Sequence, residues 1–261
     1  MRSRFTLSDA ALAGYAGLGY LAFLAATLWA AGFLAGLSIV PVTAASPARL
    51  PAWAALLADA GLLLLFAAQH TVMARPGFKR RLARLLPPAA ERSSYVLAAG
   101  LALLLVFWQW QPLPGSVWRV RAGSWADLLW AVYAAGWLIA VSATFMIDHL
   151  DFLGIRQARW GTGRGPYRPP SFSERWLYAW VRHPMMTGLL IAFWATPVMT
   201  VSHLFFAAAA TGYIAVGLRF EERDLRRQLG PAYGDYASRV PALVPRPGPR
   251  QIPAGAANPP A

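Results

Sequence analysis

Long stretches without Asp, Glu, Lys or Arg dominate the hydrophobic pattern of this 261-residue chain. These stretches, of which the second is broken only by Asp59, cover 10–48, 50–74, 93–118, 128–147 and 184–218. A helix needs about 20 apolar residues to cross the hydrocarbon core of a bilayer, so each stretch is long enough to hold a membrane span. The pattern therefore predicts an all-α, polytopic membrane helix bundle.

The last stretch is too long for one crossing. As a straight helix, 184–218 would extend about 52 Å at 1.5 Å per residue, and Pro197 and Thr200 offer a break near its middle. We expect two helices joined by a turn. The predicted spans are six in number and lie near 12–40, 53–74, 93–111, 126–147, 184–198 and 202–222.

Composition and charge support this assignment and orient the spans. The chain is 57% hydrophobic and 13% charged, which excludes an ordinary soluble domain. Of its 24 Lys and Arg residues, three (Arg49, Arg119 and Arg121) fall on one side of the predicted spans and the others on the opposite side. Basic residues stay on the cytoplasmic side, so we expect a multi-pass protein of a bacterial-type inner membrane with both termini cytoplasmic. The net charge of +13 follows from this bias, and no nucleic-acid partner is expected.

Domain boundaries, tryptophan positions and the absence of cysteine can also be read from the sequence. We expect one membrane domain over 1–245 and a disordered tail, rich in Pro, Gly and Ala, over 246–261. Trp108, Trp110 and Trp118 lie near the outer ends of spans and are expected to form an interfacial belt. With no cysteine, the chain has no disulfide, thiolate metal site or iron–sulfur cluster. Its oligomeric state is not predicted by the sequence.

Ionisable residues converge at the predicted cytoplasmic ends of the spans. His70, His149 and His183 fall at one depth together with Glu221 and Glu222, whereas His203 lies near an outer turn. Ionisable groups at a membrane boundary are costly unless they pair or line a cavity, so their convergence predicts a polar site that opens to the cytoplasm. The alternative is that each histidine is an interfacial anchor or a helix cap.

Arg182, His183 and Pro184 precede an apolar run in a way that predicts the start of a helix. Proline suits the first helical position, and the N–H groups that follow it can bind an anionic ligand group at the positive end of the helix dipole. Gly188, one turn later, allows backbone or ligand to approach closely. Simple helix capping is the alternative.

The segment 219–245 is a charged helix that breaks at Gly230 and Pro231. Adjacent acids point about 100° apart on a helix, so Glu221 or Glu222 can face a pocket and bind ribose hydroxyls or an ammonium group. The aromatic rings of Tyr233 and Tyr236 can close over a ring or a cation, or lie at the membrane interface.

The segment 148–160 alternates polar and apolar residues. Asp148, His149 and Asp151 offer an imidazole oriented by a carboxylate, which is the arrangement that a general base needs. An amphipathic interfacial helix explains the same pattern. This spacing does not define a set of metal ligands, and no metal is expected.

These motifs resemble a known family. RHPMMTG at 182–188, EERDL at 221–225 and GPAYGDYASRVPALVP at 230–245 are similar to the end of the integral-membrane methyltransferases related to isoprenylcysteine carboxyl methyltransferase. QHTVMARPGFK at 69–79, ERSSYVLAAGLALLLVFWQWQP at 91–112, SATFMIDHLDFLGIRQ at 142–157 and AFWATPVMT at 192–200 resemble the bacterial methanethiol S-methyltransferases within it. Together the blocks cover roughly 70–245. One departure is Met186, where the broader family usually has an aromatic residue.

The resemblance implies S-adenosylmethionine as methyl donor, a small thiol as substrate and dimethyl sulfide as product. It implies that the cofactor is bound by Arg182, His183, Pro184, Gly188, Glu221, Glu222, Tyr233 and Tyr236. The thiol must lose its proton, and we expect His70 or His149 to act as base, with Asp148 or Asp151 orienting the imidazole. The alternatives are an isoprenoid, phospholipid or other lipid-like acceptor, a non-enzymatic protein of nitrogen-oxide metabolism, and a small transporter.

Overall fold

The computed structural model describes residues 7–160 and 174–246. The predicted tail lies outside this part of the chain except for its first residue. The elements are α1 (Leu7–Ala35), α2 (Ala52–Ala74), α3 (Pro76–Leu82), α4 (Glu91–Gln109), β1 (Ser116–Arg119), α5 (Ser124–Ile147), α6 (His149–Phe152), α7 (Ile155–Trp160), α8 (Pro184–Trp194), β2 (Val198–Thr200), α9 (Val201–Leu229) and α10 (Pro231–Arg239). Short 3₁₀ turns cover Pro88–Ala90 and Trp176–Ala179.

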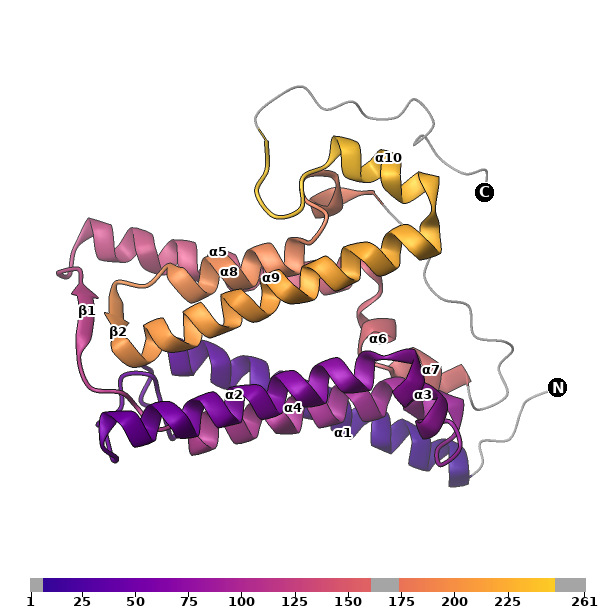
Figure 1. Ribbon diagram of the computed structural model, residues 1–261, viewed down its shortest axis with the longest axis horizontal. Helices are drawn as coiled ribbons and strands as arrows, with labels where there is room; N and C mark the ends of the chain where they lie inside the picture. Colours follow the sequence, from indigo (N-terminus) through magenta and orange to yellow (C-terminus); the bar gives the residue numbers. More distant parts are fainter. Residues whose placement is uncertain (1–6, 161–173, 247–261) are drawn as a thin grey trace.

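The main helices α1, α2, α4, α5, α8 and α9 form two layers (Figure 1). In one layer α1 and α2 pack on α4, and in the other α5 and α9 pack on α8. Successive main helices run in opposite directions, so the connecting segments collect at the two ends of the bundle (Figure 1). We call the end with α3, α6, α7 and α10 the basic end, and the end with β1 and β2 the hairpin end.

Five helices in the described residues are long and apolar enough to cross a membrane: α1, α2, α4 with the turn before it, α5 and α9. This confirms a polytopic helical membrane bundle and corrects one predicted span. Helix α8 has 11 residues and is about 16 Å long at 1.5 Å per residue. That length is about half of the hydrocarbon thickness of a bilayer. The chain continues from α8 without helix to β2, so 184–198 is not one helical span.

The break between α8 and α9 lies where the sequence predicts it. The hydroxyl oxygen of Thr200 caps α9 by accepting from the backbone N–H of His203 at 3.0 Å. Helix α9 then continues to Leu229, beyond the predicted end of the sixth span at residue 222. The last span and the charged helix after it are therefore one element.

A two-stranded antiparallel sheet at the hairpin end was not predicted. Strands β1 and β2 pair Arg119 with Val198, and the indole N–H of Trp118 donates to the carbonyl of Thr196 at 3.0 Å. Trp110 is fully buried and donates to Ser202, so the prediction of an interfacial position was wrong for this residue. These contacts tie the connection between α4 and α5 to the connection between α8 and α9.

The two layers meet in an aromatic core near the hairpin end. Phe33 of α1 packs against Phe107 of α4, against Trp110 directly after that helix and against Phe206 of α9, with ring centroids 5.1 to 5.6 Å apart. Burial of large apolar side chains is the main favourable contribution to folding. The seam between α5 and α8 depends on small residues instead, because Gly136 and Gly188 bring the two backbones close together.

Candidate functional site

The structure brings most of the predicted site residues to the basic end of the bundle. His70 lies near the end of α2, His149 begins α6, and Arg182, His183 and Pro184 lead into α8. Glu221 and Glu222 lie in the last third of α9, and Tyr233 and Tyr236 lie in α10. His203 is at the hairpin end, where its Nε2 is 2.9 Å from the carbonyl oxygen of Phe193.

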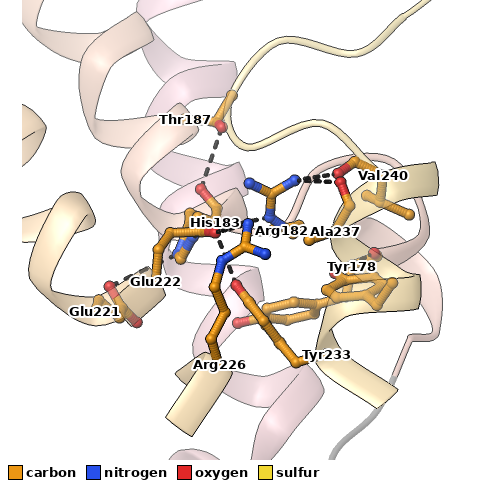
Figure 2. A network of polar contacts seen from close by, with 11 residues as sticks. Tyr178, Arg182, His183, Thr187, Glu221, Glu222, Arg226, Tyr233, Ala237 and Val240 are labelled. Carbon is orange, nitrogen blue, oxygen red and sulfur yellow. Dashed lines mark hydrogen bonds and ion pairs between the residues drawn. The ribbon is translucent and has the colours of Figure 1, made fainter. Parts of the chain in front are cut away.

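Glu222 is the centre of a compact polar network (Figure 2). Its Oε1 accepts hydrogen bonds from Nε of Arg182 at 2.7 Å, from Nε2 of His183 at 2.8 Å and from the hydroxyl of Tyr233 at 2.9 Å. Its other oxygen lies 3.5 Å from Arg226. We call Arg182, His183, Glu222 and Tyr233 the Glu222 cluster. A carboxylate with three donors on one oxygen is satisfied within the protein.

The same residues fasten α10 and the segment after it. The Nη1 of Arg182 donates to the carbonyls of Ala237 and Val240, at the end of α10. The backbone N–H groups of Arg182 and His183 donate to the carbonyls of Pro241 and Ala242 at 2.9 and 3.1 Å. Arg182 is therefore a link between α8, α9 and α10.

The two tyrosines of α10 complete this link. Both are buried, with 1% of their surface exposed. The hydroxyl of Tyr236 donates to the carbonyl of Tyr178 at 2.7 Å. Burial raises the pKa of Tyr233 to about 12, and the neighbouring carboxylate of Glu222 adds to the increase. Although burial acts to lower it, the hydrogen bond and charge of Glu222 raise the pKa of Arg182. The cluster thus joins a neutral phenol, a cation and an anion.

Glu221 differs from its neighbour. Its side chain keeps 48% of its surface exposed, and its carboxylate lies 3.6 Å from Nδ1 of His183. Burial, with the nearby charge of Glu221, raises the pKa of Tyr178 to about 12. A neutral phenol and an accessible carboxylate therefore lie beside the start of α8. The sequence analysis did not select Tyr178, although it falls in the aromatic stretch directly before Arg182.

Pro184 begins α8 as predicted. Gly188, one turn later, packs directly against the backbone of α5. A Cβ atom at Gly188 would lie 2.5 Å from the backbone nitrogen of Ala140 and 2.5 Å from the carbonyl oxygen of Gly136, both in α5. Gly188 therefore allows the close backbone approach that the sequence analysis considered, and α5 makes that approach. Met186 packs against the main apolar core.

His70 lies among aromatic rings between the two layers. The Tyr95 hydroxyl is 2.7 Å from its Nε2 and 3.2 Å from its Nδ1. The rings of Phe66, Tyr95 and Tyr213 have centroids 5.3, 4.9 and 6.2 Å from that of His70. We call Phe66, His70, Tyr95 and Tyr213 the His70 cluster. The sequence analysis missed Tyr95 and Tyr213, because nothing in their local sequence marks them as partners of His70.

His149 is buried against α1 and α5. Its Nδ1 is 2.7 Å from the hydroxyl of Thr144, its Nε2 is 3.4 Å from the hydroxyl of Tyr20, and its ring stacks on Phe145 with centroids 3.9 Å apart. Burial lowers the pKa of His149, and the opposing effect of Asp148 is smaller. The imidazole is therefore held in its neutral form.

The expectation that Asp148 or Asp151 orients the imidazole is corrected by these contacts, which come from hydroxyl groups. Asp148 caps α6 by accepting from the N–H of Asp151 at 3.1 Å and pairs with Arg156 at 2.6 Å. Asp151 accepts from Gln157 at 3.1 Å. A capping carboxylate serves the first turn of the helix that it starts, which explains why Asp148 is directed to the backbone.

Comparisons with known proteins place the chain in context. A family model described as NnrU protein matches residues 60–217. The chain is 47% identical to methanethiol S-methyltransferase of Mycobacterium tuberculosis over 89% of its own length and 95% of the relative. It is 50% identical to methanethiol S-methyltransferase 2 of Bradyrhizobium diazoefficiens over 89% of both chains.

A more distant relative is nurim of Homo sapiens, which is 32% identical over 64% of this chain and 67% of the relative. None of the solved structures matches the chain.

Proposed function

The chain belongs to the NnrU protein family and, within it, to the methanethiol S-methyltransferases, and we propose on this premise that it methylates methanethiol to dimethyl sulfide with S-adenosylmethionine as donor. The observation that carries the proposal is the near full-length identity to several proteins of that name. The membrane bundle and the polar groups at its basic end agree with it.

The residues at the basic end fit the chemistry of this methyl donor. The donor presents an ammonium group, a sulfonium and ribose hydroxyls, for which the accessible carboxylate of Glu221 is a suitable partner. The carboxylate group of the donor itself is suited to the first turn of α8, which begins at Pro184. Tyr178, with a neutral phenol, supplies an aromatic face and a hydroxyl beside them.

The other residues that were predicted to bind the cofactor contact one another or nearby backbone. Arg182, Glu222, Tyr233 and Tyr236 bond to one another or to nearby backbone, and Gly188 packs against α5. We propose that they fix the start of α8, with His183, so that Glu221 keeps its position. Bound there, the donor supplies an electrophilic methyl group for in-line transfer to sulfur.

The protein has to ionise the thiol and exclude water from it. An alkyl thiol is mostly protonated at neutral pH, and the thiolate is the nucleophile. His70 and His149 are both candidates for the base. Apolar surroundings favour the transfer, because a sulfonium and a thiolate lose their charges in the transition state.

The orientation follows from charge. We propose that the basic end faces the cytoplasm of a bacterium, that both termini lie on that side, and that residues 1–245 form the methyltransferase domain. The basic residues of α3 and of the last turns of α9 and α10 lie at this end of the described chain.

The test is binding of S-adenosylmethionine to the detergent-purified protein by calorimetry, followed by headspace detection of dimethyl sulfide after methanethiol is added. Binding with dimethyl sulfide production supports the proposal. Binding without that product redirects the assignment to a lipid-like acceptor. Folded protein that does not bind the donor contradicts the methyltransferase assignment and leaves a non-enzymatic role in nitrogen-oxide metabolism or a transporter.

A further inference from the structure

The two candidate histidines have different hydrogen-bond environments. The hydroxyl of Thr144 donates its proton to the carbonyl of Val141 at 2.7 Å, so its oxygen accepts the Nδ1–H of His149. The Nε2 of that ring is then an acceptor that faces the hydroxyl of Tyr20. His149 is thus complete as a neutral structural group, stacked on Phe145, with both ring nitrogens directed to α1 and α5.

His70 is half-buried and directed between the layers. Within the part of the chain that the structure describes, its polar partner is the hydroxyl of Tyr95 on α4, which is within hydrogen-bond distance of either ring nitrogen. Across from it on α9 is Tyr213, whose hydroxyl lies 3.1 Å from that of Thr71, the residue after His70. When the N–H of the imidazole donates to the hydroxyl oxygen of Tyr95, the other ring nitrogen of His70 carries the lone pair that can take a proton.

The position of His70 along the bundle fits a substrate that binds deeper in the membrane than the donor. Tyr213, beside His70, precedes Glu221 on α9 by eight residues, which is about 12 Å of helix. Phe220, next to Glu221, contacts Arg75 at 4.8 Å, at the end of α2. His70 therefore lies deeper in the membrane than Glu221, among the apolar rings of Phe66 and Tyr213.

We propose that Tyr95 is a positioning residue for His70 and that this pair, rather than His149, takes the proton of the thiol; the inference rests on the proposed function. The S–H bond breaks, its proton goes to the unprotonated ring nitrogen of His70, and the electron pair stays on sulfur for the bond to the methyl carbon. The donor's carbon–sulfur bond breaks as that bond forms. The imidazolium then releases its proton to water at the basic end.

The groups that face His70 set its pH response. They are Tyr95 and Arg92 from α4 and Tyr213 from α9, with Glu221 close enough to interact with Tyr95. The Nε of Arg92 donates to the carbonyl of Phe152 at 2.9 Å, and its guanidinium lies 5.5 Å from the Tyr95 ring centroid.

The test compares two thiols of similar size, ethanethiol and 2,2,2-trifluoroethanethiol, of which the second is the stronger acid. For Tyr95→Phe we expect kcat/KM with ethanethiol to fall about tenfold, and for His70→Ala about 100-fold, as for loss of a general base. Turnover of trifluoroethanethiol should be close to that of the wild type. The ethanethiol rate of Tyr95→Phe should recover as the pH rises.

Tyr133→Phe is the matched control, because it removes a hydroxyl that donates to the Ala31 carbonyl at 2.6 Å, away from His70. Calorimetry should give wild-type affinity for S-adenosylmethionine in Tyr95→Phe. An unchanged ratio of the two thiols in Tyr95→Phe, or a selective loss of ethanethiol turnover in His149→Gln, overturns the inference while the proposed function stands. A wild type that neither binds the donor nor methylates either thiol overturns both.

Discussion

The Glu222 cluster and the His70 cluster lie near the same end of the bundle and differ in how their polar atoms are used. In the first, one carboxylate oxygen of α9 accepts from three side chains, two from the segment that leads into α8 and one from α10. In the second, one phenol meets one imidazole within a ring of aromatic side chains. Many satisfied contacts hold a structure in place, whereas few contacts leave a group able to exchange a proton. In the proposed function, the Glu222 cluster is thus the structural support, and methyl transfer takes place beside it.

Replacing Glu222 should have the largest effect on the free energy of unfolding. Glu222→Ala leaves Arg182 and His183, both largely buried, without their shared anion. We expect the free energy of unfolding to fall by about 3 to 5 kcal/mol. Thermal unfolding in detergent measures it. Glu221→Ala, one residue earlier and half exposed, should lose less than about 1 kcal/mol. Equal losses at the two positions would remove the distinction between support and site.

Gly188→Ala should have the second-largest effect on the free energy of unfolding. The added Cβ would meet backbone atoms of α5 at 2.5 Å, and α8 and α5 have to move apart. We expect a loss of about 1 to 3 kcal/mol in unfolding free energy, as for other overpacked sites. Gly212→Ala is the control, because a Cβ there meets nothing within 4 Å in the same layer. A variant of normal stability with weakened donor binding would instead make Gly188 a cofactor contact.

Glu221→Gln tests the accessible carboxylate with little change in stability. The amide keeps the shape and loses the charge, so the affinity for a donor that carries an ammonium and a sulfonium should fall about tenfold, the equivalent of about 1.4 kcal/mol. Calorimetric titration with S-adenosylmethionine measures the change, and thermal unfolding serves as the check on folding. Wild-type affinity in this variant would place the donor's cationic groups elsewhere.

The sequence predicts the helices well because the signal for each is local. Runs without charge locate α1, α2, α4, α5 and α9, Pro184 marks the start of α8, and Pro197 with Thr200 marks the break before α9. The short length of α8 and the β1–β2 pair are not local properties. Strand β1 pairs with a segment about 80 residues away, and no feature of either strand by itself identifies that partner.

The grouping of the candidate site residues at one end of the bundle was predicted, whereas their contacts were not. The sequence selected Arg182, His183 and Glu222 correctly as neighbours in space, but their shared hydrogen bonds were not foreseen. Whether Glu221 or Glu222 is the buried one depends on the rotation of α9 against α8. That rotation is set by packing along the whole helix, and a difference of about 100° reverses the two roles.

The smallest expected effect concerns His149 and the pH dependence of stability. Its folded-state pKa is lowered from 6.5 by burial, so the unfolded chain binds a proton first as the pH falls. The stabilising contribution of neutral His149 is complete well above pH 6.5 and is lost progressively as the pH falls below that value.

Thermal unfolding between about pH 8 and pH 5, an interval that covers the titration range of histidine, measures this loss. The wild type should lose more stability over the range than His149→Gln, whose amide still reaches toward Thr144 and carries no proton equilibrium. Glu222 and the other acids titrate in both proteins, so the difference between the two curves isolates His149. Parallel curves would mean that His149 titrates equally in the folded and unfolded chain, which would remove the reason for treating it as a neutral structural group and reopen the choice between the two histidines.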